Sequence, residues 1–177
     1  RGVPKIYLEN TLESFKKAIE LEYDGIELDV MLTKDSVLIV HHDLEAQINA
    51  TKKDIIDLQY QDIVTALPNK PLALEEILGA IGHQTKVNIE IKDQKKGHLQ
   101  IVQKIINYLK QFNLIDNIVI SSFNPQVIKY VQKTDDRFAT AWIWGNKNFY
   151  FFNSWKVVLN YFNPNAIHAK HSLITHN

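Results

Sequence analysis

Cysteine is absent from the 177 residues of the chain, and methionine occurs only once. The lack of thiols excludes disulfide bonds, zinc–thiolate sites and cysteine nucleophiles. Charge of either sign is not in excess, since Lys+Arg and Asp+Glu both number 20. A chain with zero formal net charge shows no broad basic field, so we expect no nucleic-acid partner.

Long apolar runs are also missing, because none approaches the ~20 residues that a membrane-spanning helix needs. No signal peptide is visible, and we therefore expect a cytoplasmic protein without a transmembrane segment. Apolar residues make up 45% and charged residues 23% of the chain, which is ordinary for a globular domain. Without repeats, low-complexity tracts or linkers, residues 1–177 are interpreted as one domain.

Segments with strand periodicity alternate with segments of helical periodicity along the chain. The predicted strands are Gly25–Met31, Val37–Val40, Val87–Lys92, Ile118–Ser121, Ala139–Ile143 and Ala166–Ala169. The predicted helices are Glu9–Leu21, Thr51–Leu58, Tyr60–Leu67, Leu74–Ile81, Leu99–Phe112, one beginning at Asn124–Pro125, and Asn153–Tyr161. This order predicts an α/β fold with a parallel sheet and helical crossovers. Periodicity alone does not separate an open, doubly wound sheet from a barrel, although no glycine-rich nucleotide-binding loop is present.

Two carboxylates, Glu27 and Asp29, interrupt an otherwise apolar predicted strand. Residues two apart on a strand share a face, so these side chains would repel each other unless a cation neutralised them. The alternative is that they lie on the solvent face of an edge strand. Because parallel strands are usually buried on both faces, we favour the first interpretation.

The strand around Asn88 repeats the arrangement with Glu90 and Lys92. Glu90 would add a third carboxylate to Glu27 and Asp29, and an all-oxygen site of this kind suits Mg²⁺ or Ca²⁺. For Lys92 a purely structural ion pair is an equally good interpretation.

Histidine and tryptophan side chains mark two further strand ends. His41-His42-Asp43 follows a hydrophobic strand, and a histidine at such a position near acidic residues is a candidate for acid–base work. Trp142 and Trp144 end another strand, where both could pack and one could stack on a substrate group. No Gly-x-Ser-x-Gly surrounds Ser121 or Ser122, which disfavours a serine nucleophile.

Several blocks, taken in order along the chain, resemble the glycerophosphodiester phosphodiesterase family. They are Arg1-Gly2, Glu9-Asn10-Thr11, the Glu27-x-Asp29 pair, His42-Asp43, Leu74-Glu75-Glu76, Asn88 to Lys92, Ser121 to Asn124, and the segment from His168 to Thr175. The resemblance implies a TIM-type (β/α) barrel with its active site at the carboxyl ends of the strands. It also implies metal-dependent hydrolysis of a small-molecule glycerophosphodiester to an alcohol and sn-glycerol 3-phosphate.

The resemblance also implies roles for individual residues. Glu27, Asp29 and Glu90 match the family's ligands for a divalent cation, Mg²⁺ or Ca²⁺. His42, Arg1 and Glu9 match catalytic positions, with His42 as the general acid or base, and Lys92 and Arg1 match groups that contact the phosphate. We add Trp142 as a candidate substrate contact at the barrel mouth.

The sequence departs from the family pattern at several places, and one is the loop after Asp43, which lacks the usual Arg-Thr-Thr and glycine run. Leu8 stands where the family has proline, the family's first histidine would immediately precede Arg1, and the family's last strand would follow the final residue. We therefore expect a barrel that is incomplete at both ends in this chain. Two alternatives remain open: a related barrel phosphodiesterase acting on lysophospholipids or sphingolipids, and a degenerate barrel that binds metal or phosphate without catalysis.

Overall fold

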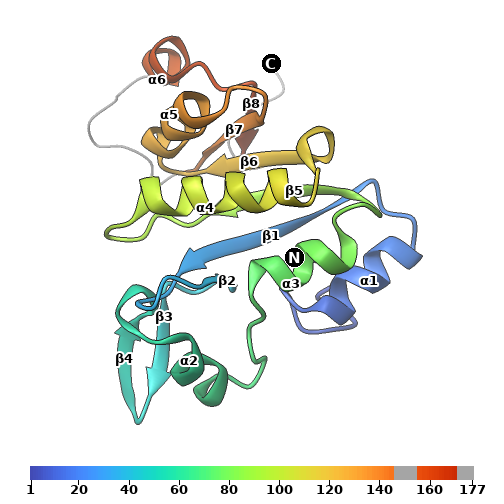
Figure 1. Ribbon diagram of the computed structural model, residues 1–177, viewed down its shortest axis with the longest axis vertical. Coiled ribbons are helices and arrows are strands. Elements are labelled where there is room, and N and C mark those ends of the chain that lie inside the picture. Colours follow the sequence, from blue (N-terminus) through green and yellow to red (C-terminus); the bar gives the residue numbers. More distant parts are fainter. Residues whose placement is uncertain (146–154, 171–177) are drawn as a thin grey trace.

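The computed structural model describes residues 1–145 and 155–170, and its main feature is a sheet of six strands (Figure 1). The strand order is β2-β1-β5-β6-β7-β8. The strands are β1 (Gly25–Leu32), β2 (Leu38–Val40), β5 (Lys86–Ile91), β6 (Ile118–Ser122), β7 (Ala139–Trp144) and β8 (Ala166–Ala169). Strand β1 pairs parallel with β5, and the parallel pairing continues through β8, whereas β2 is antiparallel to β1.

Helices follow most of the strands, as the periodicity predicts. They are α1 (Leu12–Glu20), α2 (Tyr60–Ala66), α3 (Leu74–Ile81), α4 (His98–Gln111), α5 (Pro125–Thr134) and α6 (Trp155–Phe162). There are also two short 3-10 turns among the described residues, η1 (Ile55–Asp57) and η2 (Ile115–Asn117). The first two residues of the helix expected at Asn153–Tyr161, and residues 171–175 of the last family block, lie outside the described part of the chain. None of the described helices has the length and apolarity that crossing a bilayer requires.

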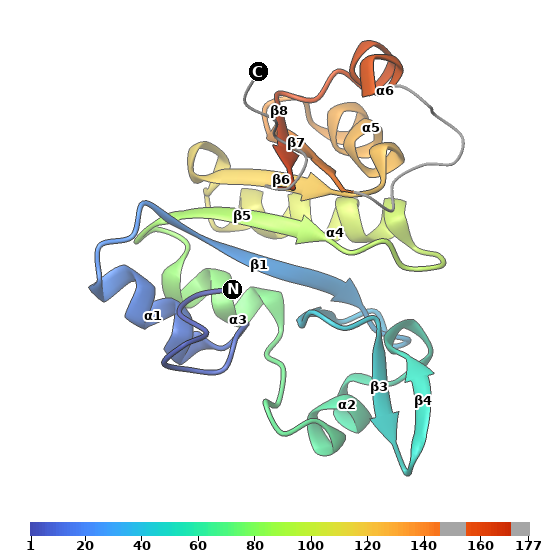
Figure 2. The same cartoon turned by 180° about the vertical axis from the view of Figure 1, so that it is seen from behind.

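Helices α1, α3, α4, α5 and α6 pack on one face of the sheet, and α3 and α4 lie in front of strands β1 and β5 in Figure 1 and behind them in Figure 2. The main core lies in this layer, where Leu28 and Val30 of β1 pack with Phe15 of α1, Ile77 of α3 and Ile105 of α4. Helix α2 differs, because its Ile63 packs with Met31 of β1 and Ile39 of β2 in a smaller core on the other face.

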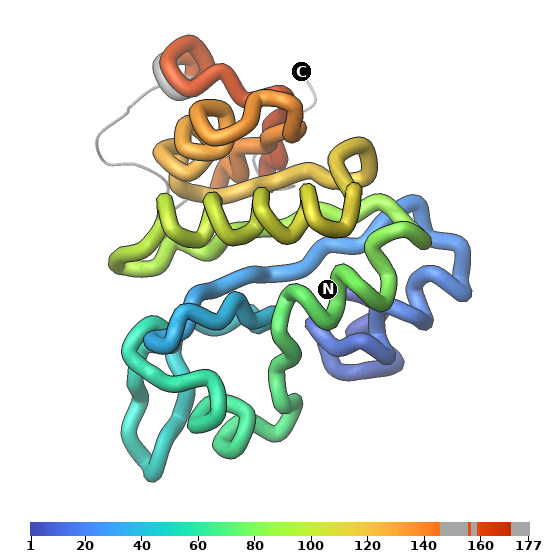
Figure 3. Tube along the Cα trace, viewed as in Figure 1, coloured from blue at the N-terminus to red at the C-terminus, as the bar shows by residue number. Residues whose placement is uncertain are grey.

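From β1 to β8 the chain advances steadily across the sheet, as the colour sequence in Figure 3 shows. Helices on one side of a parallel sheet are the arrangement of a (β/α) barrel, whereas an open, doubly wound sheet has helices on both faces. The structure therefore favours the barrel arrangement over the doubly wound sheet. In the described residues the sheet is an open arc with β2 and β8 at its edges.

One predicted element was wrong. The segment Thr51–Leu58 is not a helix: Thr51–Asp54 forms strand β4, which pairs antiparallel with β3 (Glu45–Ile48), and η1 follows. Asn49 and Ala50 connect the two strands with positive φ angles of 47° and 63°. Two consecutive residues with positive φ make a tight hairpin turn, and this turn overrides the weak helical pattern of the polar sequence.

Candidate active site

Three carboxylates lie together on the face of the sheet opposite helices α1, α3 and α4. Strand alternation puts Glu27 and Asp29 on this face of β1, and the parallel register sets Asp29 opposite Glu90 of β5. One oxygen from each of the three carboxylates lies within 4.8 Å of the others. The spacing of the acids in the sequence thus predicted their convergence correctly, because two adjacent parallel strands carry them.

Asp29 is fully buried and has three side-chain partners. Its Oδ2 accepts a hydrogen bond from Asn10 Nδ2 at 2.8 Å and lies 3.0 Å from Arg1 Nε, and its Oδ1 accepts from Lys92 Nζ at 3.2 Å. Arg1 also pairs with Glu9, its Nη1 lying 3.2 Å from Glu9 Oε2. Arg1, Glu9 and Lys92, expected at the site from the resemblance, are therefore joined to the carboxylate group.

The sequence did not predict the contact of Asn10 with Asp29. Its neighbour Thr11 caps α1, accepting a hydrogen bond from the main-chain NH of Ser14. Asn10 is buried, has a φ of 57°, and binds both the carboxylate and the main-chain NH of Asp29. Asparagine tolerates this left-handed conformation better than most residues, which is the signal that could have singled it out.

The two carboxylate oxygens of Glu27 differ in their hydrogen bonding. Its Oε2 accepts from the main-chain nitrogen of Arg1 at 2.9 Å, whereas Oε1 is buried and has no hydrogen-bond partner among the described residues. Burial, and after it the charge of Asp29, raise the pKa of the Glu27 carboxyl. Asn88 Oδ1 is likewise buried without a partner in the described chain.

Glu27 and Asn88 line one cavity of about 390 Å³ together with Glu90 and His168, so the region offers oxygen ligands that the protein leaves unsatisfied.

The charges at the site are unbalanced. Glu9, Glu27, Asp29 and Glu90 face the cationic side chains of Arg1 and Lys92, and Glu27 also pairs with the amino group of Arg1 at 2.9 Å. Burial lowers the pKa of Lys92, but its hydrogen bond to Glu90 and the charge of Asp29 outweigh burial, so the pKa is raised and the amine stays protonated. The carboxylates still outnumber these cations, a divalent cation would offset the remaining negative charge, and carboxylate oxygens are the ligands that such hard cations prefer. The acidic residues therefore fit a bound divalent metal ion.

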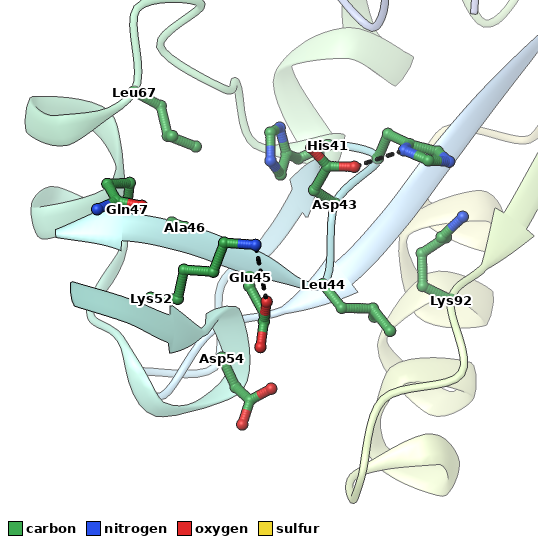
Figure 4. A pocket seen from close by; sticks show the side chains of 11 residues that line it. His41, Asp43, Leu44, Glu45, Ala46, Gln47, Lys52, Asp54, Leu67 and Lys92 are labelled. Atoms are coloured by element: carbon green, nitrogen blue, oxygen red, sulfur yellow. Dashed lines mark hydrogen bonds and ion pairs between the residues drawn. The ribbon is translucent and has the colours of Figure 1, made fainter. Parts of the chain in front are cut away.

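His42 and His41 lie beside this group, on a cavity of about 770 Å³ that Lys92 also lines (Figure 4). His42 Nδ1 lies 2.8 Å from Asp43 Oδ1, and this hydrogen bond lowers the pKa of the Asp43 carboxyl. His41 is more enclosed: its main-chain NH donates to the carbonyl oxygen of Asp29, and burial lowers the pKa of its imidazole. Both histidines therefore line the cavity.

Trp142 does not lie at the mouth of the barrel, so its predicted contact with the substrate was wrong. Its side chain is 2% exposed and packs against Ile128 and Phe162 in the helix layer, and its Nε1 donates to the carbonyl oxygen of Phe123 at 3.1 Å. The register pairs Ser121 with Ala141, so Trp142 occupies the opposite face of β7 from the row that continues Asp29 and Glu90. Sequence reasoning placed the residue near a strand end correctly but could not fix which face it occupied.

Comparisons with known proteins bear on this geometry. The sequence matches the Glycerophosphoryl diester phosphodiesterase family over residues 1–177. It is 34% identical over 145 residues to the glycerophosphodiester phosphodiesterase of Caldanaerobacter subterraneus subsp. tengcongensis, a match that covers 75% of this chain and 60% of that relative. The chain therefore spans less than two thirds of that relative's length.

Solved structures resemble the fold closely. The glycerophosphodiester phosphodiesterase of Thermotoga maritima superposes with a TM-score of 0.74 at 26% identity, over 96% of this chain and 70% of that protein. An Oleispira antarctica phosphodiesterase, solved in complex with the product sn-glycerol-3-phosphate, superposes with a TM-score of 0.83 at 20% identity, over 99% of this chain and 74% of that one. The fold is that of these TIM-barrel enzymes, with the described strands forming an arc of the barrel.

Proposed function

The chain belongs to the glycerophosphoryl diester phosphodiesterase family, and from that premise we propose that the protein hydrolyses glycerophosphodiesters to an alcohol and sn-glycerol 3-phosphate. The observation that carries the proposal is the meeting of Glu27, Asp29 and Glu90 beside Lys92 and Arg1. A relative of the same fold is known with sn-glycerol-3-phosphate bound, which supports this product for the present chain.

Glu27, Asp29 and Glu90 would hold the divalent cation, which we propose to be Mg²⁺ or Ca²⁺. When bound, such an ion supplies Lewis-acid polarisation of the phosphoryl oxygens and of a substrate hydroxyl. The bound cation would also offset the negative charge of the carboxylates around it.

Arg1 and Lys92 would bind the phosphate of the substrate. Both are held by carboxylates, Arg1 by Glu9 and Asp29, and Lys92 by Asp29 and Glu90, so their positions are set before substrate arrives. Preset cationic donors stabilise the charge that develops on a phosphoryl group, without a cost of reorganisation during the reaction. Glu9 acts in this scheme by orienting Arg1.

His42 would transfer the proton. When its Nδ1–H donates to Asp43, Nε2 is left free to exchange a proton with the substrate. The protonated imidazole would donate from Nε2 to the leaving oxygen as the P–O bond to the alcohol breaks. The neutral imidazole would then accept a proton from the water that takes the place of the alcohol on phosphorus, which gives sn-glycerol 3-phosphate. Asp43 fixes the tautomer and stabilises the charged imidazole, as the carboxylate partner of a catalytic histidine does.

The test is to measure release of sn-glycerol 3-phosphate from glycerophosphoethanolamine, with Mg²⁺, with Ca²⁺ and with a chelator. We expect turnover that either cation restores and the chelator abolishes. Glu27→Gln keeps the shape of the side chain while removing its charge, and it should lower turnover at least ~100-fold. Cleavage of lysophospholipid or sphingolipid in place of glycerophosphoethanolamine would favour the related barrel phosphodiesterases. No turnover of any of them by folded protein would contradict an enzymatic role.

A further inference from the structure

The cavity of about 770 Å³ beside His42 extends away from the three carboxylates. Its walls are the loop His41–Leu44, strand β3, residues of β4, Leu67 and Lys92. Glu27, Asp29 and Glu90 are not among the lining residues, while Lys92 belongs both to the cavity and to the carboxylate group. Its volume lies within the range of about 300–1,000 Å³ that is usual for small-molecule sites.

Lys92 and His42 both line the cavity, and their proposed roles indicate which part of the substrate it would hold. A diester bound with its phosphate at Lys92 and its glycerol toward the carboxylates has its second substituent on the other side of phosphorus. That side is the cavity, which is also lined by His42, the proposed donor to the leaving oxygen. On the basis of the proposed function, we propose that this cavity binds the leaving alcohol, and that the alcohol it takes is polyhydroxylated.

The hairpin wall carries the chemistry that selects such an alcohol. The register pairs Gln47 with Lys52 and Glu45 with Asp54, so strand alternation sets these four side chains on one face of the hairpin. All four line the cavity, and Figure 4 shows Glu45 and Lys52 opposite Lys92. Asp54 forms an ion pair with Lys95, so Glu45, Gln47 and Lys52 are the side chains of this face that are available to bind a ligand.

These groups retain hydrogen-bonding capacity. Lys52 Nζ lies 3.8 Å from Glu45 Oε2, which is an ion pair but too long for a hydrogen bond. The ammonium can therefore donate to a ligand oxygen while the carboxylate accepts from a ligand hydroxyl. The amide of Gln47 offers one group of each kind. A wall of mixed donors and acceptors matches hydroxyl groups, each of which both donates and accepts.

Other leaving groups fit the walls less well. Apart from the two histidines, no aromatic side chain is among the described residues that line the cavity, so a quaternary ammonium group would find no aromatic cage. The apolar side chains Leu44, Ala46 and Leu67 are interspersed with charged ones, which disfavours an acyl chain.

The test compares three substrates on variants of the hairpin: glycerophosphoglycerol, glycerophosphocholine and the methyl ester of sn-glycerol 3-phosphate, whose methyl group is too small to reach β3 and β4. Lys52→Met should lower kcat/KM for glycerophosphoglycerol about tenfold or more and leave the methyl ester within about twofold. Glu45→Gln should act in the same way, which guards against an effect of one side chain on folding. Lys53→Met is the matched control, because Lys53 is exposed on the other face of the same strand.

Each outcome bears on one of the two proposals. Equal losses for the methyl ester and glycerophosphoglycerol, or no loss for either, would overturn the subsite while leaving diester hydrolysis intact. A wild-type preference for glycerophosphocholine over glycerophosphoglycerol would overturn the polyhydroxylated alcohol. Failure of the wild-type protein to hydrolyse even the methyl ester would contradict the proposed function, and the subsite with it.

Discussion

Asp29 is the residue on which the polar contacts of the site converge, although it is completely buried. The alternation of Glu27 and Asp29 with apolar residues was enough to predict their shared face, because strand geometry depends on local spacing alone. The bond from Asn10 to Asp29 could not be predicted in this way, since it joins residues 19 apart through a left-handed backbone conformation. Local periodicity carries no information about such contacts.

Replacement of Asn10 tests how the site is held. Asn10→Gly permits the φ of 57° but removes the hydrogen bonds to Asp29, and it should lower the free energy of unfolding by about 1.5–3 kcal/mol. Asn10→Ala should cost roughly 1 kcal/mol more, because a Cβ is strained at this angle. Urea unfolding measures both. Equal stability of wild type and Asn10→Gly would show that the bonds to Asp29 contribute nothing net.

His42 and His41 are neighbours with different surroundings, so their variants form a natural pair. His42→Ala should lower kcat by about 10²–10⁴-fold, the usual contribution of a general acid or base, and leave Mn²⁺ affinity unchanged. His41→Ala should cost less than about tenfold in kcat, because His41 lacks the hydrogen bond to Asp43 that fixes the tautomer of His42. Steady-state kinetics and a Mn²⁺ titration separate the two effects. A greater loss in His41→Ala would reassign proton transfer to His41.

At the scale of elements, the helices and the sheet strands were predicted within a few residues, whereas the hairpin β3–β4 was not. Apolar periodicity locates elements that pack against a core, and β4 has none, since Thr51, Lys52 and Lys53 are all exposed. Its strand conformation comes from pairing with β3 and from the turn between them. Alanine at a turn position with positive φ gave no sequence signal of a hairpin, because glycine is the usual residue there.

Ala50→Gly should therefore stabilise the hairpin. Ala50 has a φ of 63°, where an L side chain is strained, and relief of that strain exceeds the entropy that glycine adds to the unfolded chain. We expect a gain of about 0.5–1 kcal/mol in the free energy of unfolding, measured by urea denaturation. Asn49→Gly is the control and should gain less, because asparagine tolerates this conformation. A loss of stability in Ala50→Gly would contradict the turn geometry.

The contact of helix α4 with the turn before β7 should make stability depend on pH. The hydrogen bond from Arg137, followed by that from Lys110 of α4, lowers the pKa of Asp135 in the folded protein. A lowered folded pKa means that the stabilisation is complete above the unfolded value of about 3.9 and is lost as pH falls below it. Asp135→Asn should cost about 1 kcal/mol at pH 7, a modest figure because Arg137 and Lys110 are largely exposed.

The cost of Asp135→Asn should shrink when unfolding is measured at about pH 3, because the carboxylate is then largely protonated in the unfolded chain while the folded protein keeps it ionised. Asp136→Asn, at the exposed neighbouring position, serves as the control and should show little difference between the two pH values. A cost for Asp135→Asn that stays constant with pH would rule out the ion pairs as its source.

For the molecule as a whole, alternation of strands and helices predicted the α/β class but not the side on which the helices lie. That side depends on the handedness and succession of the crossovers, which appear only when the chain is folded. With α1, α3 and α4 on one face, the other face of β1 and β5 can gather acids from distant segments, next to the small core that α2 forms with Met31. The same one-sided layer explains why Trp142 packs among helices rather than at the mouth.

The most direct test of the central claim is an anomalous-difference map from crystals of the protein soaked in Mn²⁺. The geometry predicts a peak among Glu27, Asp29 and Glu90, about 2.0–2.6 Å from a carboxylate oxygen of each, as expected for hard divalent cations. Glu27→Gln crystals treated in the same way should lose the peak. A peak at another place, or none, under conditions in which Mn²⁺ supports diester hydrolysis would contradict the account.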